Sequence, residues 1–111
     1  GGYVALRALT APGAHGAFSC GVACAGIADW FCQQRYTEVR YYDYALMGGW
    51  THDAKVRARA REASPHTHVA RLEAPLLVLH GEDDVDVPFV QARAFVEAAR
   101  AARSANDVAA P

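Results

Sequence analysis

The sequence lacks the features that mark membrane-spanning and nucleic-acid-binding proteins. A transmembrane helix needs about 20 consecutive apolar residues, and no stretch approaches that length. The first residues also do not form the basic segment and apolar run of a secretory leader. The 11 Lys and Arg residues stand against 12 Asp and Glu residues, which gives a net charge of −1. Because neither sign of charge dominates, we expect neither a nucleic acid nor a membrane as a partner.

Cysteine is scarce, and its number is odd. The three thiols, Cys20, Cys24 and Cys32, lie in apolar sequence, which favours small buried side chains over a disulfide framework. Reduced thiols are typical of a reducing compartment, so the cytoplasm is the expected location, although no address signal in the sequence assigns one.

The spacings of common metal and cofactor sites are also missing. The sequence has no phosphate-binding glycine loop and no EF-hand loop. His66 and His68 could place two imidazoles on one side of an extended segment, but no third ligand accompanies them. We therefore expect no metal and no cofactor.

Helical and strand patterns alternate along a chain that is 52% hydrophobic, as in a globular protein. The expected elements are a helix over residues 1–10, a buried strand over 18–25, irregular helix over 31–50 that covers a pocket or an interface, a charged helix over 54–63 stopped by Ser64-Pro65, a buried strand over 76–80 and a helix from Pro88 onward. This order indicates an α/β fold, with parallel β-strands flanked by helices. The continuously apolar run 76–80 is expected in a strand covered on both faces.

Two strands are too few for a complete sheet, because a parallel pair needs neighbours to bury its edges. The first helix begins at Gly1-Gly2, with no Ser, Thr or Asp to cap it. The last residues, 104–111, are either a loop that leads to a further strand or a frayed end. We therefore expect the chain to be an excerpt from a larger α/β domain.

Four carboxylates follow the second expected strand, in the segment LLVLHGEDDVDVP: Glu82, Asp83, Asp84 and Asp86. In open α/β sheets, functional residues gather in the loops at the carboxyl ends of the strands. One hypothesis is that Asp86 caps the helix that begins near Pro88 while the other carboxylates face water. A second is a magnesium or calcium site. The third is that one carboxylate orients a histidine.

The third hypothesis agrees with a resemblance to a known family. LHGEDDVDVP is similar to the HGxxDxxVP stretch of α/β-hydrolases, in particular serine peptidases of the prolyl oligopeptidase family, which includes dipeptidyl peptidases and acylaminoacyl peptidases. GGYVALRAL resembles the helix that follows the family's nucleophile elbow, G-x-S-x-G-G-Y, and AGIADW resembles the strand and turn after it. EASPHTHVARLEAPLLVLHGEDDVDVPF resembles the family's approach to the catalytic acid. The resemblance covers most of the chain and is weakest over residues 31–63.

The resemblance implies a partial α/β-hydrolase fold in which Asp84 is the acid of a Ser-Asp-His triad. It places the serine two positions before Gly1, and any side chain at Gly1 or Gly2 would crowd that sharp turn. The triad histidine should follow Asp84, whereas all five histidines precede it: His15, His52, His66, His68 and His80. Residues 1–111 are then a fragment of a single catalytic domain, inactive alone, whose partners are the rest of that domain and an N-terminal β-propeller.

The resemblance also implies substrate-binding positions. In several members, aromatic residues after the strand that follows the elbow line the pocket for the residue before the cleaved bond, and the matching residues are Trp30, Tyr36, Tyr41 and Tyr42. The alternative is that these aromatics only cover the sheet. Some members carry an arginine two positions beyond the acid, where this chain has Asp86. This difference leaves both peptide and ester substrates open.

Other residues resemble catalytic groups less well. Ser19 lies in Ala-Phe-Ser-Cys-Gly, one residue away from G-x-S-x-G, but an elbow serine needs a strand before it and a helix after it. No basic residue near Cys20 or Cys24 in the sequence would activate a thiol. His80 is expected to hold the acid loop by a local hydrogen bond. Three functions remain: part of a serine peptidase, part of another α/β-hydrolase such as a carboxylesterase, or a non-catalytic α/β interaction module.

Overall fold

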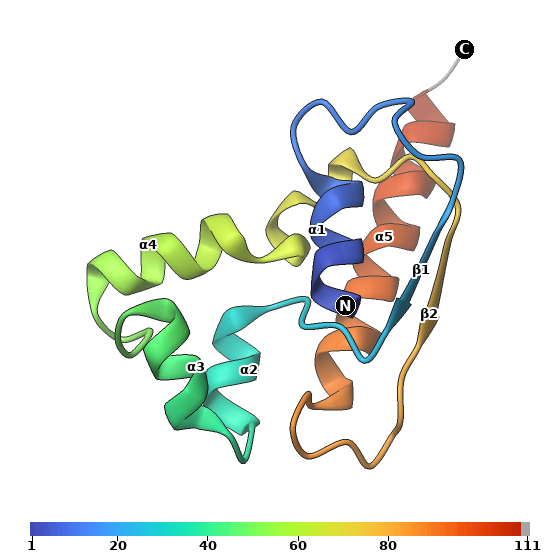
Figure 1. Cartoon of the computed structure of the whole chain (residues 1–111). Coiled ribbons are helices and arrows are strands. Elements are labelled where there is room, and N and C mark those ends of the chain that lie inside the picture. The colour runs from blue at the N-terminus through green and yellow to red at the C-terminus, as the bar shows by residue number, and fades with distance from the viewer. Residues whose placement is uncertain (110–111) are drawn as a thin grey trace.

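The computed structural model describes residues 1–109, which form two parallel strands and a set of helices (Figure 1). The elements are α1 (Gly2–Thr10), β1 (Gly21–Cys24), α2 (Trp30–Tyr36), α3 (Arg40–Met47), α4 (Ala54–Ala63), the 3-10 helix η1 (Pro65–Arg71), β2 (Leu76–Leu79) and α5 (Phe89–Ala109). Their order follows the predicted alternation of helix and strand. The predicted α/β class, with parallel strands flanked by helices, is confirmed.

The two strands pair in parallel, with Gly21 opposite Leu76 and Cys24 opposite Leu79. Both strands therefore end at the same edge of the sheet. The helices α1 and α5 lie on one side of the sheet, while α2, α3 and α4 extend away from it as a separate helical lobe (Figure 1). This arrangement leaves the opposite face of the sheet without a covering layer within the described residues.

The hydrophobic core has two parts. The first lies between the sheet and its helices and contains Leu6, Ala23, Ala28 and Phe95. The second lies within the helical lobe and contains Trp30, Met47, Val56 and Ala60. Leu6 and Leu9 on α1 are buried three positions apart, and so are Ala92 and Phe95 on α5. This spacing is that of amphipathic helices with one apolar face.

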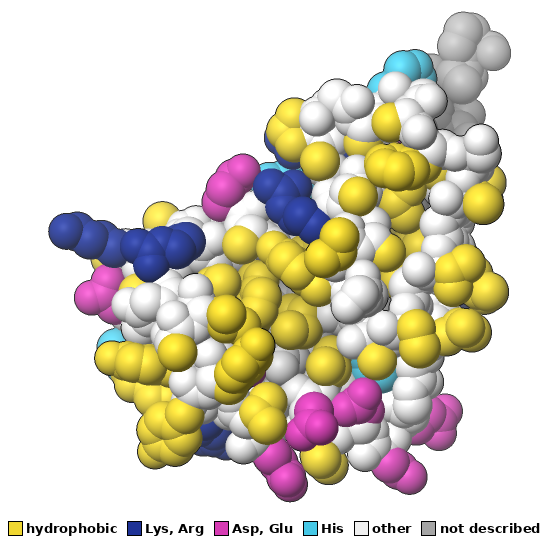
Figure 2. Space-filling view, viewed as in Figure 1, with side chains coloured by type: hydrophobic (Ala, Val, Ile, Leu, Met, Phe, Trp, Pro, Cys, Tyr) yellow, Lys and Arg dark blue, Asp and Glu magenta, His cyan; other side chains and the backbone are white. Residues whose placement is uncertain are grey.

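The prediction that residues 76–80 are covered on both faces is wrong for this structure. Exposure alternates along the strands, and the outward side chains of Val22, Leu77 and Leu79 are 56%, 54% and 48% exposed. Hydrophobic side chains accordingly line the margin of the molecule at the sheet (Figure 2). The prediction of buried thiols also fails for Cys20 and Cys24, which are exposed, while Cys32 on α2 is partly buried. Both errors have one cause: side chains alternate across a strand, and only one face has helices packed on it.

Other boundaries also differ from the sequence prediction. The first strand covers Gly21–Cys24 rather than residues 18–25, and the segment 31–50 forms two helices, α2 and α3, instead of one irregular helix. Ser64 ends α4, as predicted. Most of the tail from residue 104 continues α5 as far as Ala109, and the rest of it lies outside the described residues. None of the helices in residues 1–109 is both long and apolar enough to cross a membrane.

Asp29 caps α2, and its removal should weaken the helical lobe. Its Oδ1 accepts hydrogen bonds from the backbone N–H groups of Phe31, at 2.9 Å, and Cys32, at 3.4 Å. We expect Asp29→Ala to lower the free energy of unfolding by about 1 kcal/mol, the usual loss for an N-cap, as measured by urea denaturation. Asp29→Asn is the matched control because asparagine caps equally well. Equal midpoints for the two variants would contradict this role.

Candidate active site

The candidate site lies where both strands end. β1 leads through residues 25–29 into α2, and β2 leads through His80 into a loop that precedes α5. We call residues 81–88 the acid loop. Acidic side chains gather at the end of the molecule where this loop lies (Figure 2). Since parallel strands present their carboxyl ends at one edge, the acid loop and the entrance to α2 are brought together.

Asp84 is held by the main chain of the acid loop through one of its two oxygens. Oδ1 accepts hydrogen bonds from the backbone N–H groups of Asp86, at 3.0 Å, and Val87, at 2.8 Å. Oδ2 lies 3.7 Å from His80 Nε2, and within residues 1–109 it accepts no hydrogen bond. The side chain is 24% exposed. The carboxylate is thus oriented while one oxygen remains available to an N–H donor.

The hypothesis that Asp86 caps the helix is wrong. No hydrogen bond to the Asp86 side chain is found within the described residues, and the N–H groups just ahead of α5 are bound by Asp84 instead. The physical reason is the turn over residues 85–88, which points the N–H groups of Asp86 and Val87 back at Asp84. Pro88 at the end of this turn has no N–H to be capped.

His80 ties the two ends of the acid loop together, as the sequence predicts. Its ring is 2% exposed, and Nε2 is 2.6 Å from the carbonyl oxygen of Val87. The edge of the ring also faces Phe89 at the start of α5, with ring centroids 6.0 Å apart. His80 therefore fixes where the loop returns to the body of the domain.

The carboxyl end of α2 binds the acid loop from the other side. The backbone N–H of Glu38 donates to the carbonyl oxygen of Val85 at 3.0 Å. Gln33 Nε2 and Thr37 Oγ1 both donate to the carbonyl oxygen of Asp86, at 2.8 and 2.6 Å. Three consecutive carbonyls of the loop, including the one bound by His80, thus have partners outside it. Sequence reasoning missed these contacts, and the only signal was a pair of polar residues four positions apart, Gln33 on α2 and Thr37 at its C-cap.

Of the four aromatic residues matched to a substrate pocket, Trp30 does not have the expected surroundings. It is 4% exposed and packs edge-on against Tyr3, with ring centroids 5.5 Å apart, inside the second core. It is therefore a core residue of the helical lobe in this structure. Tyr36, Tyr41 and Tyr42 are 58%, 77% and 67% exposed. Tyr36 directly precedes Thr37, whose hydroxyl donates to the acid loop.

Gly2 allows the start of α1 to touch the end of β1. A Cβ atom at Gly2 would lie 2.3 Å from the carbonyl oxygen of Cys24 and 2.6 Å from the Cα of Gly26, whereas a Cβ at Gly1 would meet no atom within 4 Å. The two glycines predicted to relieve crowding thus differ within this structure, and only Gly2 is closely packed. Ser19 lies ahead of β1 with a strand, not a helix, after it, so it does not occupy an elbow.

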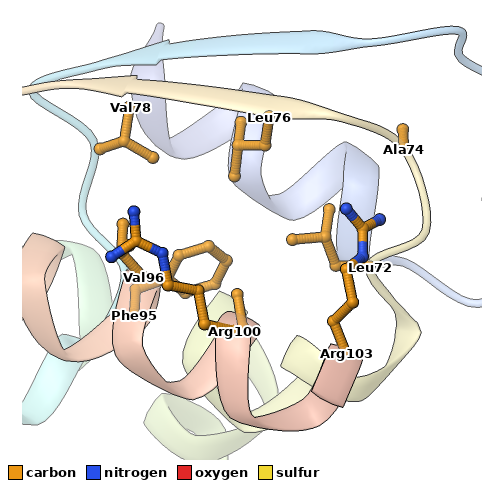
Figure 3. A pocket seen from close by; sticks show the side chains of 9 residues that line it. Leu72, Ala74, Leu76, Val78, Phe95, Val96, Arg100 and Arg103 are labelled. Carbon is orange, nitrogen blue, oxygen red and sulfur yellow. The ribbon is translucent and has the colours of Figure 1, made fainter. Parts of the chain in front are cut away.

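A groove lies between β2 and α5 (Figure 3). Leu76 and Val78 face Phe95 across it, and Arg100 and Arg103 stand on α5 at its side. Its lining has no Ser, Cys, His or carboxylate side chain, so the groove offers no nucleophile or general base. Among residues 1–109, no group of three or more His, Cys, Asp or Glu side chains is arranged to hold a metal ion.

Asp43 lies beneath the site and carries a perturbed carboxyl group. It is 1% exposed, and its Oδ2 accepts a hydrogen bond from Gln33 Nε2 at 3.1 Å. Burial raises the pKa of Asp43 above its ordinary value of 3.8, and the bond from Gln33 opposes this shift less strongly. The folded protein therefore binds this proton more tightly than the unfolded chain.

It follows that Asp43 should make the protein less stable as the pH rises. Where the folded state binds more protons, the free energy of unfolding falls with pH, from the ordinary pKa up through the raised one. We expect Asp43→Asn, which cannot ionise, to gain stability relative to the parent protein as the pH rises above the ordinary pKa of 3.8. Urea midpoints at several pH values measure this difference. A difference that stays constant with pH would mean that the Asp43 pKa is not raised.

Comparisons with known proteins find similar sequences over most of the chain. A family model described as the prolyl oligopeptidase family matches residues 1–110. Dipeptidyl-peptidase 5 of Porphyromonas endodontalis is 33% identical over 85 residues, which are 75% of this chain and 12% of that protein. Esterase LipC of Mycobacterium tuberculosis is 51% identical over 41 residues, or 37% of this chain and 10% of that protein.

A solved structure with the same fold is the uncomplexed acylaminoacyl peptidase of Pyrococcus horikoshii. It superposes with a TM-score of 0.76 at 24% identity, over 91% of this chain and 16% of the other. The fold of the chain is therefore that of part of an α/β-hydrolase. The chain spans only about an eighth of the length of the dipeptidyl peptidase that it matches.

Proposed function

Because the chain belongs to the prolyl oligopeptidase family, we propose that it forms part of a serine peptidase catalytic domain in which Asp84 is the acid of a Ser-Asp-His triad. The observation that carries this proposal is the state of the Asp84 carboxylate. Its Oδ1 is fixed by two backbone N–H groups at 3.0 and 2.8 Å, and its Oδ2 is left to another donor. A carboxylate held in this way at the carboxyl edge of a parallel sheet is suited to orient an imidazole.

The proposed reaction is acyl transfer. A serine two positions before Gly1 attacks the substrate carbonyl, and a histidine that follows Asp84 in the sequence takes the serine proton and later gives it to the leaving group. Asp84 Oδ2 accepts the N–H of that histidine, which fixes its tautomer and stabilises its cation. The backbone N–H of the residue before Gly1 would donate to the developing oxyanion.

The domain proposal explains why one face of the sheet is apolar and bare. Residues 1–111 would be a fragment that lacks both the elbow serine and the histidine region, and its outward side chains, Val22, Leu77 and Leu79, would be covered by the rest of the catalytic domain. An N-terminal β-propeller would be a further neighbour. In this proposal the chain by itself does not hydrolyse substrate.

The substrate class is proposed to be a peptide, with Tyr36 in contact with it. Tyr36 is exposed and directly precedes Thr37, which bonds the acid loop. Tyr41 packs against Trp50 with ring centroids 5.8 Å apart and shares α3 with Tyr42. Tyr41 and Tyr42 are therefore proposed only as contacts at the outside of the substrate site, and Trp30 is not proposed to contact the substrate. An ester substrate is the second candidate, which the local match to an esterase favours.

The DNA on either side of the segment that encodes residues 1–111 gives the first test. We expect it to encode G-x-S-x directly before Gly1 and a histidine after Asp84. An upstream β-propeller would favour the peptidase over the esterase. Flanks without the serine would overturn the proposal.

The second test is hydrolysis by the complete protein. Dipeptidyl and acylaminoacyl amides of a chromogenic amine should be compared with short-chain esters of a chromogenic alcohol. Turnover of the amides supports a peptidase, and turnover of the esters alone supports the esterase. If neither is hydrolysed, the proposed chemistry is wrong.

A further inference from the structure

Two buried glutamines connect elements that are far apart in the sequence. Gln33 on α2 and Gln91 on α5 are 1% and 2% exposed, and Gln91 Nε2 donates to Gln33 Oε1 at 2.8 Å. The side-chain oxygen of Gln91 accepts the backbone N–H groups of Ala28, at 2.9 Å, and Asp29, at 3.1 Å. Gln91 thus holds both the entrance to α2 and the side chain of Gln33.

The amide of Gln33 is hydrogen-bonded through its oxygen and through both of its N–H groups. Its oxygen accepts from Gln91, and its nitrogen donates to Asp86 O at 2.8 Å and to Asp43 Oδ2 at 3.1 Å. An amide has two N–H donors, so both are used here. In a buried site, an amide with three hydrogen bonds can be rotated only by breaking them together, which fixes its orientation.

This fixed amide acts on the peptide unit that orients Asp84. Asp86 O receives Gln33 Nε2 and Thr37 Oγ1, while the N–H of Val87, which belongs to the same peptide unit, donates to Asp84 Oδ1 at 2.8 Å. A displacement of the Asp86 main chain would therefore carry the Asp84 carboxylate with it. The bonds run without interruption from Gln91 through Gln33 and Asp86 to Asp84.

We propose that Gln33, oriented by Gln91, is a positioning residue that sets the place of the Asp84 carboxylate in the triad. This inference rests on the proposed function and goes beyond it, because it assigns a role in the reaction to side chains that do not touch the substrate. The structural alternative is that the pair only fastens α2 to α5. The two roles differ in whether the chemistry of the triad changes when the pair is broken.

Gln34 provides a matched control on the same helix. It is 5% exposed, its Nε2 donates to Gly49 O at 2.9 Å, and its Oε1 accepts Thr51 N at 2.7 Å. It is therefore buried and hydrogen-bonded at both ends of its amide, as Gln33 is, although with one bond fewer. It binds the segment between α3 and α4 instead of the acid loop. Gln33→Met and Gln34→Met each keep the side-chain volume and remove the amide.

The experiment compares these variants in the complete protein at a temperature where both are folded. For Gln33→Met we expect kcat to fall by about 10- to 100-fold with KM nearly unchanged, since misplacement of a catalytic group by about 1 Å costs about 100-fold. The acid limb of kcat/KM against pH should move to lower pH, because the imidazole loses part of the support of a nearby carboxylate. Gln34→Met should leave kcat and the acid limb unchanged.

Hydrogen exchange gives a readout that does not need activity. The N–H groups of Asp86 and Val87 donate to Asp84, so exchange in the acid loop should speed up in Gln33→Met and not in Gln34→Met. If Gln33→Met does not fold, Thr37→Val can replace it, because this variant removes one donor to Asp86 O. Its changes in kcat, in the acid limb and in exchange should have the same direction and be smaller. Equal effects of the variants and the Gln34 control would overturn the inference.

Failure of the inference can be told apart from failure of the proposed function. If Asp84→Asn abolishes turnover while Gln33→Met behaves like Gln34→Met, only the positioning role is lost. If Asp84→Asn leaves turnover intact, the triad assignment itself is lost, and the positioning role with it.

Discussion

Replacement of Asp84 by asparagine is expected to lower kcat of the complete protein by about 10³- to 10⁴-fold. An amide in place of the carboxylate favours the wrong tautomer of the histidine and no longer stabilises its cation. Folding should be preserved, because the side-chain oxygen of asparagine can still accept the N–H groups of Asp86 and Val87 that Asp84 Oδ1 binds. The measurement is steady-state hydrolysis of the best amide or ester substrate, and KM should change little.

Asp83→Asn is the matched control for this variant. Asp83 precedes Asp84 directly and is exposed, so the substitution removes the same charge from the same loop without touching the triad. We expect its kcat to stay within about twofold of the parent value, since exposed charges interact weakly through water. Unchanged turnover in Asp84→Asn, or an equal loss in Asp83→Asn, would remove Asp84 from the mechanism.

Substitution of Gly2 by alanine is expected to destabilise the protein by about 2 kcal/mol or more. The added Cβ would lie 2.3 Å from Cys24 O and 2.6 Å from Gly26 Cα, and overpacking of this kind costs about 1 to 3 kcal/mol. The upper end applies because the atoms it meets are backbone and cannot move aside as a side chain does. Alanine is the better helix former by about 1 kcal/mol in a helix interior, which offsets only part of the cost at a helix start.

The denaturation midpoint in urea measures this loss. Gly1→Ala and Gly81→Ala are the controls, because a Cβ at either position meets no atom within 4 Å. Both controls should remain close to the parent protein in stability. If Gly2→Ala unfolded at the same midpoint as Gly1→Ala, the close approach of α1 and β1 would not matter to stability.

The sequence was sufficient to predict the order of the elements and the place of Asp84. Helical spacing in the first and last segments and an apolar run before HGEDD determine these features, because both arise from contacts that are local in the chain. The same reasoning predicted that His80 would hold the acid loop, and its partner Val87 is only 7 residues away.

What the sequence did not predict depends on distant partners. Gln33 and Gln91 are 58 residues apart, and neither periodicity nor a motif marks them as a pair. The burial of Trp30 likewise depends on Tyr3, which comes from another helix. The bare face of the sheet was missed because an apolar strand has the same composition whether or not a second layer lies over it.

The pairing of only two strands has a practical consequence for handling the chain. In residues 1–109 each strand is bonded to one neighbour, so each has an outer row of N–H and C=O groups free to accept another extended segment. Such rows, next to apolar side chains, are templates for intermolecular pairing and precipitation. We therefore expect residues 1–111 to aggregate when produced alone, and to aggregate less within the larger catalytic domain proposed above.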